Sequence, residues 1–180
     1  MSTSEIMSVS RITLLAALLV AAPAIADSPG LGAKITEADV GAWAITVLPD
    51  GTNLPAGSGT AAQGAKTYAE KCVACHGEGG KGGPYATLVS DVPLQGRGIE
   101  APKTIKNFWA NATTVYDYIR RAMPWPNPRT LSDEEVYGLV AYILSENKII
   151  EKDAVMDAKS LPQVKMPNRD NFIVKFPDKI

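Results

Sequence analysis

The sequence predicts an all-α domain of three or more helices, placed between two extended, irregular segments. Helix-start patterns and apolar residues at helical spacing concentrate in residues 60–148. Residues 27–59 are rich in glycine and proline, and prolines interrupt residues 149–180. We therefore expect a helical domain at 60–148, with an N-terminal arm before it and a strand-poor C-terminal tail after it.

The first helix of the domain is expected to begin at Thr60. Thr60 and Gln63 form a capping-box pattern, in which each side chain bonds a backbone N–H near the helix start. This helix should run to Cys72. In the arm that precedes it, we expect at most one turn of helix, near residues 36–40.

Two further helices are predicted in the second half of the domain. One covers residues 114–122 and must end at Met123, because a residue that precedes a proline avoids helical geometry. The other follows the capping box of Ser132 and Glu135, with Leu131 placed for a hydrophobic staple. Its apolar stripe consists of Val136, Leu139, Val140 and Ile143.

The N-terminus has the features of an export signal, residues 1–26. Arg11 precedes an apolar run at residues 12–22, and Ala24 and Ala26 give the small-x-small pattern of a cleavage site. The run is too short to cross a bilayer as a helix, although a permanent anchor is the alternative interpretation. We expect a periplasmic protein without stable membrane insertion.

The charge of the chain is nearly balanced. Removal of the signal takes away one base and one acid, which leaves 17 Lys and Arg against 18 Asp and Glu. This balance argues against nucleic acid or an anionic membrane surface as a partner.

The residues from Cys72 to His76 form a C-x-x-C-H motif, the attachment signature of c-type haem. At the end of a helix, the thiols of Cys72 and Cys75 can reach the two vinyl groups on one porphyrin edge. The imidazole of His76 is then placed beneath the iron as the proximal ligand. One motif predicts one covalently bound haem c.

Other uses of two cysteines are less consistent with this sequence. A structural zinc site needs four ligands, and the chain has no further cysteine or histidine to complete one. A thioredoxin-like redox pair expects a βαβ pattern, which is missing. A short-loop disulfide is the remaining alternative, but it would leave His76 without a role.

The second axial ligand of the iron is expected to be Met123. His76 is the only histidine, so the natural sixth ligand is a methionine, which raises the reduction potential. Met123 follows His76 by 47 residues, at a helix end in a proline-rich stretch that restricts the backbone. Met156 and Met166 lie in the tail, where packing or exposure is the simpler interpretation.

Further residues are candidates for the surroundings of the haem. The proximal imidazole should donate its second ring N–H to a backbone carbonyl, and Pro84 is the candidate provider. Arg97, Arg120, Arg121 and Trp109 are candidates to face the haem propionates, and ordinary solvated charge is the alternative for each arginine.

Taken together, these motifs resemble the class I cytochrome c family over residues 60–148. The resemblance implies a class I cytochrome c fold, in which the first and last helices cross with a small residue against an aromatic one; Gly64 and Tyr142 resemble that pair. The matching elements are Gly64-x-x-x-Tyr68-x-x-x-Cys72, the Gly82-Gly83-Pro84 turn, Ala122-Met123-Pro124, and the closing segment from Leu131 to Ile143.

A narrower resemblance extends over nearly the whole chain after the signal. Residues 54–60, 108–119, 153–158 and 161–170 resemble the cytochrome subunit of sulfane dehydrogenase from the Sox thiosulfate-oxidation system, and cytochromes of related molybdenum sulfite dehydrogenases. This implies a molybdopterin partner subunit that oxidises a sulfur compound. Many Sox cytochrome subunits are longer and carry a second haem, whereas this chain has one motif, so the substrate stays open between sulfane and sulfite.

The function expected from these features is electron transfer without substrate catalysis by this chain. It would take electrons from the molybdopterin subunit and pass them to another cytochrome or an oxidase. The alternatives are a freely diffusing carrier that serves other periplasmic dehydrogenases, or a haem enzyme or sensor with an exchangeable sixth ligand. The arms are expected to wrap a partner or to fold back on their own domain.

Overall fold

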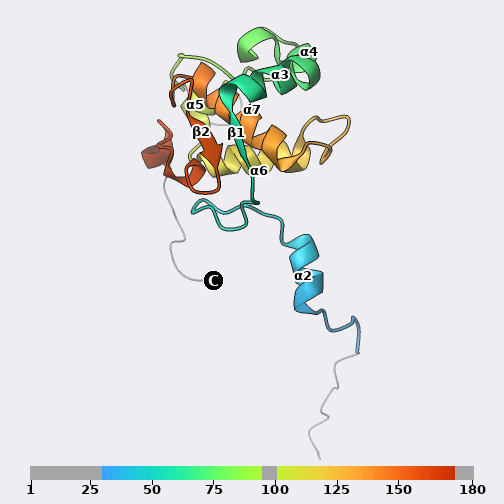
Figure 1. Cartoon of the computed structure of the whole chain (residues 1–180). Coiled ribbons are helices and arrows are strands. Elements are labelled where there is room, and N and C mark those ends of the chain that lie inside the picture. The colour runs from blue at the N-terminus through green and yellow to red at the C-terminus, as the bar shows by residue number, and fades with distance from the viewer. Residues whose placement is uncertain (1–29, 95–100, 173–180) are drawn as a thin grey trace, which may run out of the picture. The chain divides into compact units, whose positions relative to one another are not determined.

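The computed structural model describes residues 30–94 and 101–172 (Figure 1). The expected signal peptide lies outside these residues. The chain divides into two compact units, one ending at Val40 and one beginning at Gly41, and the second contains the predicted helical domain. Among the described residues, no helix is both long enough and apolar enough to cross a membrane.

The three predicted helices are present: α3 (Ala61–Lys71), α6 (Ala112–Ala122) and α7 (Asp133–Glu146). Capping boxes at Thr60 and Ser132 start α3 and α7 as the sequence predicts. Helix α6 begins two residues earlier than expected and ends at Met123, as predicted.

The structure also contains short helices that the sequence did not indicate, some between these three and some in the tail. The most useful for the site is α4 (Val73–His76), which follows α3 directly. Helix α5 (Ile105–Phe108) starts with a capping box in which Asn107 replaces the usual Glu or Gln. The single-turn 3-10 helices are η1 (Glu78–Gly80), η2 (Leu161–Gln163) and η3 (Arg169–Asn171).

Helices α3 and α7 cross with their backbones in contact. A Cβ atom placed on Gly64 would lie 1.8 Å from the carbonyl oxygen of Gly138, so only glycine fits there. At the crossing Gly64 lies against Gly138, and the Tyr142 ring contacts Tyr68, with centroids 5.0 Å apart. The expected pairing of Gly64 with Tyr142 stays a prediction. A glycine on each helix brings the axes close enough for the two tyrosines to meet beside the crossing.

The N-terminal arm contains more structure than predicted. Helix α2 (Glu37–Trp43) is two turns long instead of one at most. Thr36 and Asp39 explain the extra turn, because the Asp39 carboxylate accepts the Thr36 N–H at 2.8 Å and the Thr36 hydroxyl accepts the Asp39 N–H at 3.2 Å. This is a capping box with Asp in place of Glu or Gln.

The later part of the arm folds back on the helical domain. The N–H of Val47 donates to the buried carboxylate of Asp117 at 3.0 Å, and the Tyr137 hydroxyl donates to the Pro55 carbonyl at 2.9 Å. Val47 is itself buried. Of the two alternatives for the arm, self-packing therefore holds for residues 47–55.

The C-terminal tail is also part of the domain. Strand β2 (Val155–Asp157) pairs antiparallel with β1 (Ser58–Thr60), with Gly59 opposite Met156. This strand pair was not expected, because the tail was predicted to be poor in strands. It brings Met156, Leu161 and Met166 into the hydrophobic core, which confirms packing as the role of the two tail methionines.

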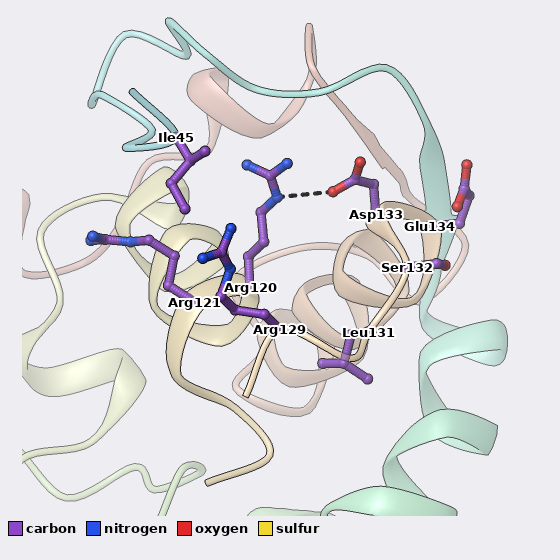
Figure 2. Close-up of a pocket in the computed structure, with 8 residues that line it drawn as sticks. All are labelled: Ile45, Arg120, Arg121, Arg129, Leu131, Ser132, Asp133 and Glu134. Atoms are coloured by element: carbon purple, nitrogen blue, oxygen red, sulfur yellow. Dashed lines mark hydrogen bonds and ion pairs between the residues drawn. The ribbon is translucent and has the colours of Figure 1, made fainter. Parts of the chain in front are cut away.

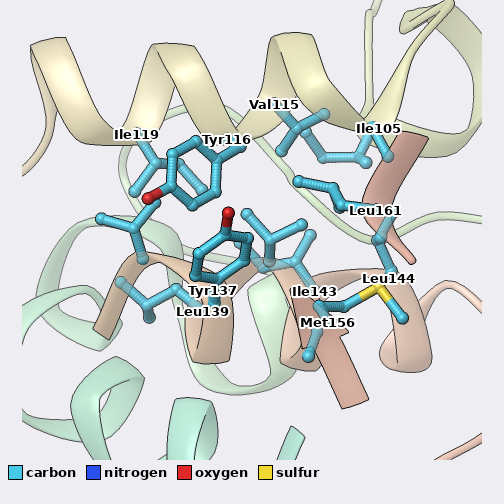
Figure 3. Packing of buried hydrophobic residues seen from close by; sticks show 14 of the residues in the cluster. Ile105, Val115, Tyr116, Ile119, Tyr137, Leu139, Ile143, Leu144, Met156 and Leu161 are labelled. Carbon is cyan, nitrogen blue, oxygen red and sulfur yellow. The ribbon is translucent and has the colours of Figure 1, made fainter. Parts of the chain in front are cut away.

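The core lies between α6, α7 and the tail (Figure 3). The rings of Tyr116 and Tyr137 meet at its centre, with centroids 4.5 Å apart, and both are completely buried. The Tyr116 hydroxyl donates to Asp133 at the start of α7. Burial of these aromatic rings supplies a large part of the apolar area that stabilises the domain.

Replacement of Gly64 by Ala should destabilise the domain. The new methyl group would overlap the backbone of α7, and overpacking of this kind costs about 3 kcal/mol. Guanidinium unfolding of the haem-loaded protein measures the loss. Gly41→Ala is the matched control, since a Cβ there meets no atom within 4 Å; equal stability of the two variants would contradict the close crossing.

Replacement of Asp117 should release the arm. Asp117→Ala leaves the Val47 N–H without its acceptor and Arg121 without its ion pair, at a cost of about 2 kcal/mol. Asp117→Asn keeps an acceptor oxygen and should lose about half as much. Hydrogen exchange followed by mass spectrometry should find faster exchange of the Val47 amide in the Ala variant than in the Asn variant.

Candidate haem-binding site

Helix α4 places the three residues of the attachment motif on one helical turn. Cys72 caps α4, and its carbonyl accepts the N–H groups of Cys75 and His76 at 3.1 and 3.0 Å. Both cysteines are free thiols and partly buried. Two thiols and an imidazole on one turn are the donor set that a c-type haem requires.

The His76 ring is held by a hydrogen bond to a backbone carbonyl, as predicted, but the carbonyl belongs to another residue. The Nδ1 atom lies 2.8 Å from the carbonyl oxygen of Ala86 rather than from that of Pro84. The Tyr85 N–H bonds the Cys75 carbonyl, which fixes the loop so that the Ala86 oxygen meets the ring. Because a carbonyl can only accept, Nδ1 carries the proton and Nε2 keeps a free lone pair for a metal.

The loop between α4 and Ala86 has no room for a larger residue at Gly77 or Gly83. A Cβ on Gly77 would lie 1.9 Å from the Lys81 carbonyl, and one on Gly83 would lie 2.3 Å from the Cys75 carbonyl. Gly77 also has a φ of 75°, which favours glycine. The Tyr68 hydroxyl donates to the Gly77 carbonyl at 2.9 Å, so α3 supports this loop as well.

Asn147, at the end of α7, holds the second part of the same loop. Its buried amide donates to the Leu88 carbonyl at 3.2 Å and to the Ile143 carbonyl at 2.9 Å. The Leu88 carbonyl also accepts the Ile105 N–H. Sequence reasoning missed Asn147, since an asparagine after a helix resembles an ordinary cap; it also missed Ala86, whose contribution comes from the backbone alone.

The Cys72 thiol does not have the lowered pKa of a reactive C-x-x-C cysteine. Burial raises the pKa of Cys72 to about 11, and Lys71 offsets this only in part. Reactive C-x-x-C thiols instead have a lowered pKa. In the part of the chain that the structure describes, no group of three or more His, Cys, Asp and Glu side chains is placed to hold a metal ion.

Met123 lies at the end of α6, where its N–H donates to the Ile119 carbonyl at 3.0 Å. Its backbone is extended and the peptide bond to Pro124 is cis. The side chain is half-buried against the edge of the core, unlike Met156 and Met166, which are enclosed within it. Of these three methionines, Met123 therefore has the sulfur that a bound group could reach without disturbing the core.

Half-buried apolar side chains from four different segments border the core in the same way as Met123. They include Val73 on α4, Leu88 in the following loop, and Leu131 before α7. Trp109 belongs to this set and packs edge-on against Tyr118, with centroids 5.5 Å apart. Of these, Val73 is next to Cys72 in the chain and Leu88 follows Ala86 by two residues, so apolar side chains border the attachment motif, as suits a porphyrin, which is mostly apolar.

The predicted arginines are engaged in ion pairs within the domain. The Arg120 Nε lies 3.0 Å from an Asp133 carboxylate oxygen, and Arg121 pairs with Asp117. Both line a surface pocket of 410 Å³ together with Arg129 (Figure 2). Arg97 lies outside the described residues.

Comparison with known proteins agrees with this geometry. Residues 59–143 match the family described as cytochrome c oxidase, cbb3-type, subunit III. The fold matches a chain in the crystal structure of the sulfane dehydrogenase SoxCD from Paracoccus pantotrophus, with a TM-score of 0.72 and 34% sequence identity. The match covers 84% of this chain and 73% of that one. No curated protein sequence matched.

The match to the SoxCD chain extends well beyond the attachment motif, to most of both chains. The protein therefore belongs to the cytochrome c family, as an electron carrier related to the cytochrome component of sulfane dehydrogenase.

Proposed function

We propose that this protein is a periplasmic cytochrome with one covalently bound haem c, and that it serves a molybdenum dehydrogenase of sulfur compounds. It takes electrons from the molybdopterin subunit, which oxidises a sulfane or sulfite substrate. It then passes them to another cytochrome or an oxidase. The observation that carries this proposal is the orientation of His76, whose Nδ1 bond to Ala86 leaves Nε2 free beside two unpaired thiols.

The residues of the site have separate tasks in this function. Cys72 and Cys75 would hold the haem through thioether bonds, and His76 and Met123 would supply the protein ligands to its iron. The hydrogen bond from Nδ1 to the Ala86 carbonyl fixes the ring and increases the electron density at Nε2. The haem, when bound, supplies the one-electron redox change.

The apolar residues around the site control its environment. Val73 and Leu88, close in the chain to Cys72 and Ala86, would help to exclude water from a haem bound here and so lower the local dielectric constant. The Met123 thioether favours the reduced state and raises the reduction potential. Electron transfer needs no acid, base or nucleophile, so this chain acts as the electron-transfer subunit of the dehydrogenase.

The partner assignment rests on the SoxCD match, whose covered share extends far outside the cytochrome segment at 59–143. A freely diffusing carrier is the second candidate. The self-packing of residues 47–55 and of the tail favours it, since part of the flanking chain serves the domain itself. The two functions differ in whether a stable partner accompanies the protein.

Purification of the tagged protein from its native periplasm should recover one haem per chain and a stoichiometric molybdenum subunit. Metal analysis and mass spectrometry identify both. Addition of the subunit's sulfur substrate should then reduce the haem, as followed by its absorption spectrum. A lone haem monomer that neither sulfite nor a sulfane compound reduces would instead support the diffusing carrier.

Replacement of Met123 by Ala should lower the reduction potential and open the iron to added cyanide or CO. The physical reason is the loss of the thioether, which stabilises the reduced state and occupies the sixth position. Potentiometric titration and ligand-binding spectra measure both effects. Met156→Leu is the matched control, because this buried methionine packs in the core; a Met123→Ala spectrum identical to this control would refute the assignment.

A further inference from the structure

The first part of the N-terminal arm exposes apolar side chains to an unusual degree. Trp43 is 85% exposed, Leu31 is 88% exposed and Ile35 is 73% exposed. Val40 is also exposed. Large apolar side chains that lie this close together along the chain are a recognised mark of an interaction surface.

Helix α2 is well specified locally but too short to be stable alone. The Thr36–Asp39 capping box defines its start, and Asp39 and Glu37 place negative charge at the positive end of the helix dipole. Isolated helices shorter than about 12 residues are marginal in water, and α2 has seven residues. A helix of this kind gains its stability from the surface against which its apolar face packs.

The apolar face of α2 has a defined chemical pattern. Val40 and Trp43 are three residues apart and therefore share one face. Glu37 lies three residues before Val40, and Asp39 lies four residues before Trp43, so a carboxylate flanks each apolar side chain. A complementary surface would have an apolar groove with basic residues along its rim.

The chain fixes the position from which α2 can reach a partner. The arm is bonded to the cytochrome domain from Val47 onward, through Asp117, and only three residues separate Val47 from Trp43. Partner contacts made by α2 are thus tied to the domain by a short connection. A short tether gives a high effective concentration for a second contact between the same two proteins.

The match to the SoxCD chain indicates which partner this is. It covers 84% of the present chain, whereas residues 60–148 make up only about half of it. The likeness therefore includes much of the flanking chain, and the matched chain comes from the structure of a two-component dehydrogenase.

We propose that residues 31–43 dock onto the molybdenum dehydrogenase subunit, with Val40 and Trp43 of α2 inserted in an apolar groove that has a basic rim. This inference rests on the proposed function and adds the surface that recognises the partner. It assigns residues 31–43 to binding and residues 47–55, which are hydrogen-bonded to the helices, to attachment on the cytochrome domain.

The test uses the molybdenum subunit that copurifies with the wild-type protein, separated and recombined with haem-loaded variants. The double variant Val40→Ala/Trp43→Ala should bind with a Kd about 30-fold higher, the loss typical when a central interface tryptophan is truncated. Because both side chains are exposed, its haem spectrum and stability should equal those of the wild type. Val155→Ala, at an exposed apolar residue on β2, should bind normally.

Each other outcome overturns the inference in a distinguishable way. If no molybdenum subunit binds the wild type, the proposed function and the docking surface both fail. If the subunit binds wild type and double variant equally, only the docking surface fails. If sedimentation shows that the wild type forms a dimer which the double variant loses, while binding of the subunit is unchanged, the face belongs to a second copy of this chain.

Discussion

The backbones of α3 and α7 meet at Gly64 and Gly138, and the position of the site depends on this contact. Helix α4 follows α3 after a single residue, so the angle of the crossing determines where the two thiols and the imidazole lie. Contacts beside the crossing hold the same geometry: Tyr68 meets Tyr142, and the Lys71 ammonium lies 2.5 Å from the Glu135 carboxylate. The ion pair is partly exposed and contributes little, whereas a side chain at Gly64 would force the helices apart.

The orientation of His76 depends on groups that take no part in redox chemistry. The Ala86 carbonyl orients His76, and Asn147 connects the loop after Ala86 to the end of α7 through the Leu88 carbonyl. Among the described residues, every buried side-chain nitrogen and oxygen atom has a hydrogen-bond partner, which a low-dielectric interior requires. The loop that orients the imidazole is therefore held by Asn147 at the end of α7. The same helix crosses α3 at Gly138, further toward its start.

Local sequence patterns predicted the three main helices, because capping boxes at Thr60 and Ser132 and the proline after Met123 act over a few residues. Contacts between distant segments could not be predicted in this way. The pairing of β1 with β2 joins residues almost one hundred positions apart, and neither strand exceeds three residues. The haem motif was likewise readable from its spacing, whereas the Ala86 carbonyl was not, because any residue offers a carbonyl and only the loop geometry selects one.

The strand pair also determines the smallest fragment of this protein that can be expected to fold. Thr60 ends β1 and caps α3, so the helix that leads to the attachment motif begins in a strand whose partner lies in the tail. A fragment cut to residues 59–143 would lack β2 and Leu161, and would leave completely buried side chains of α7 facing water. The boundaries recognised by sequence similarity are thus narrower than the cooperative folding unit, which extends from about residue 47 to Met166.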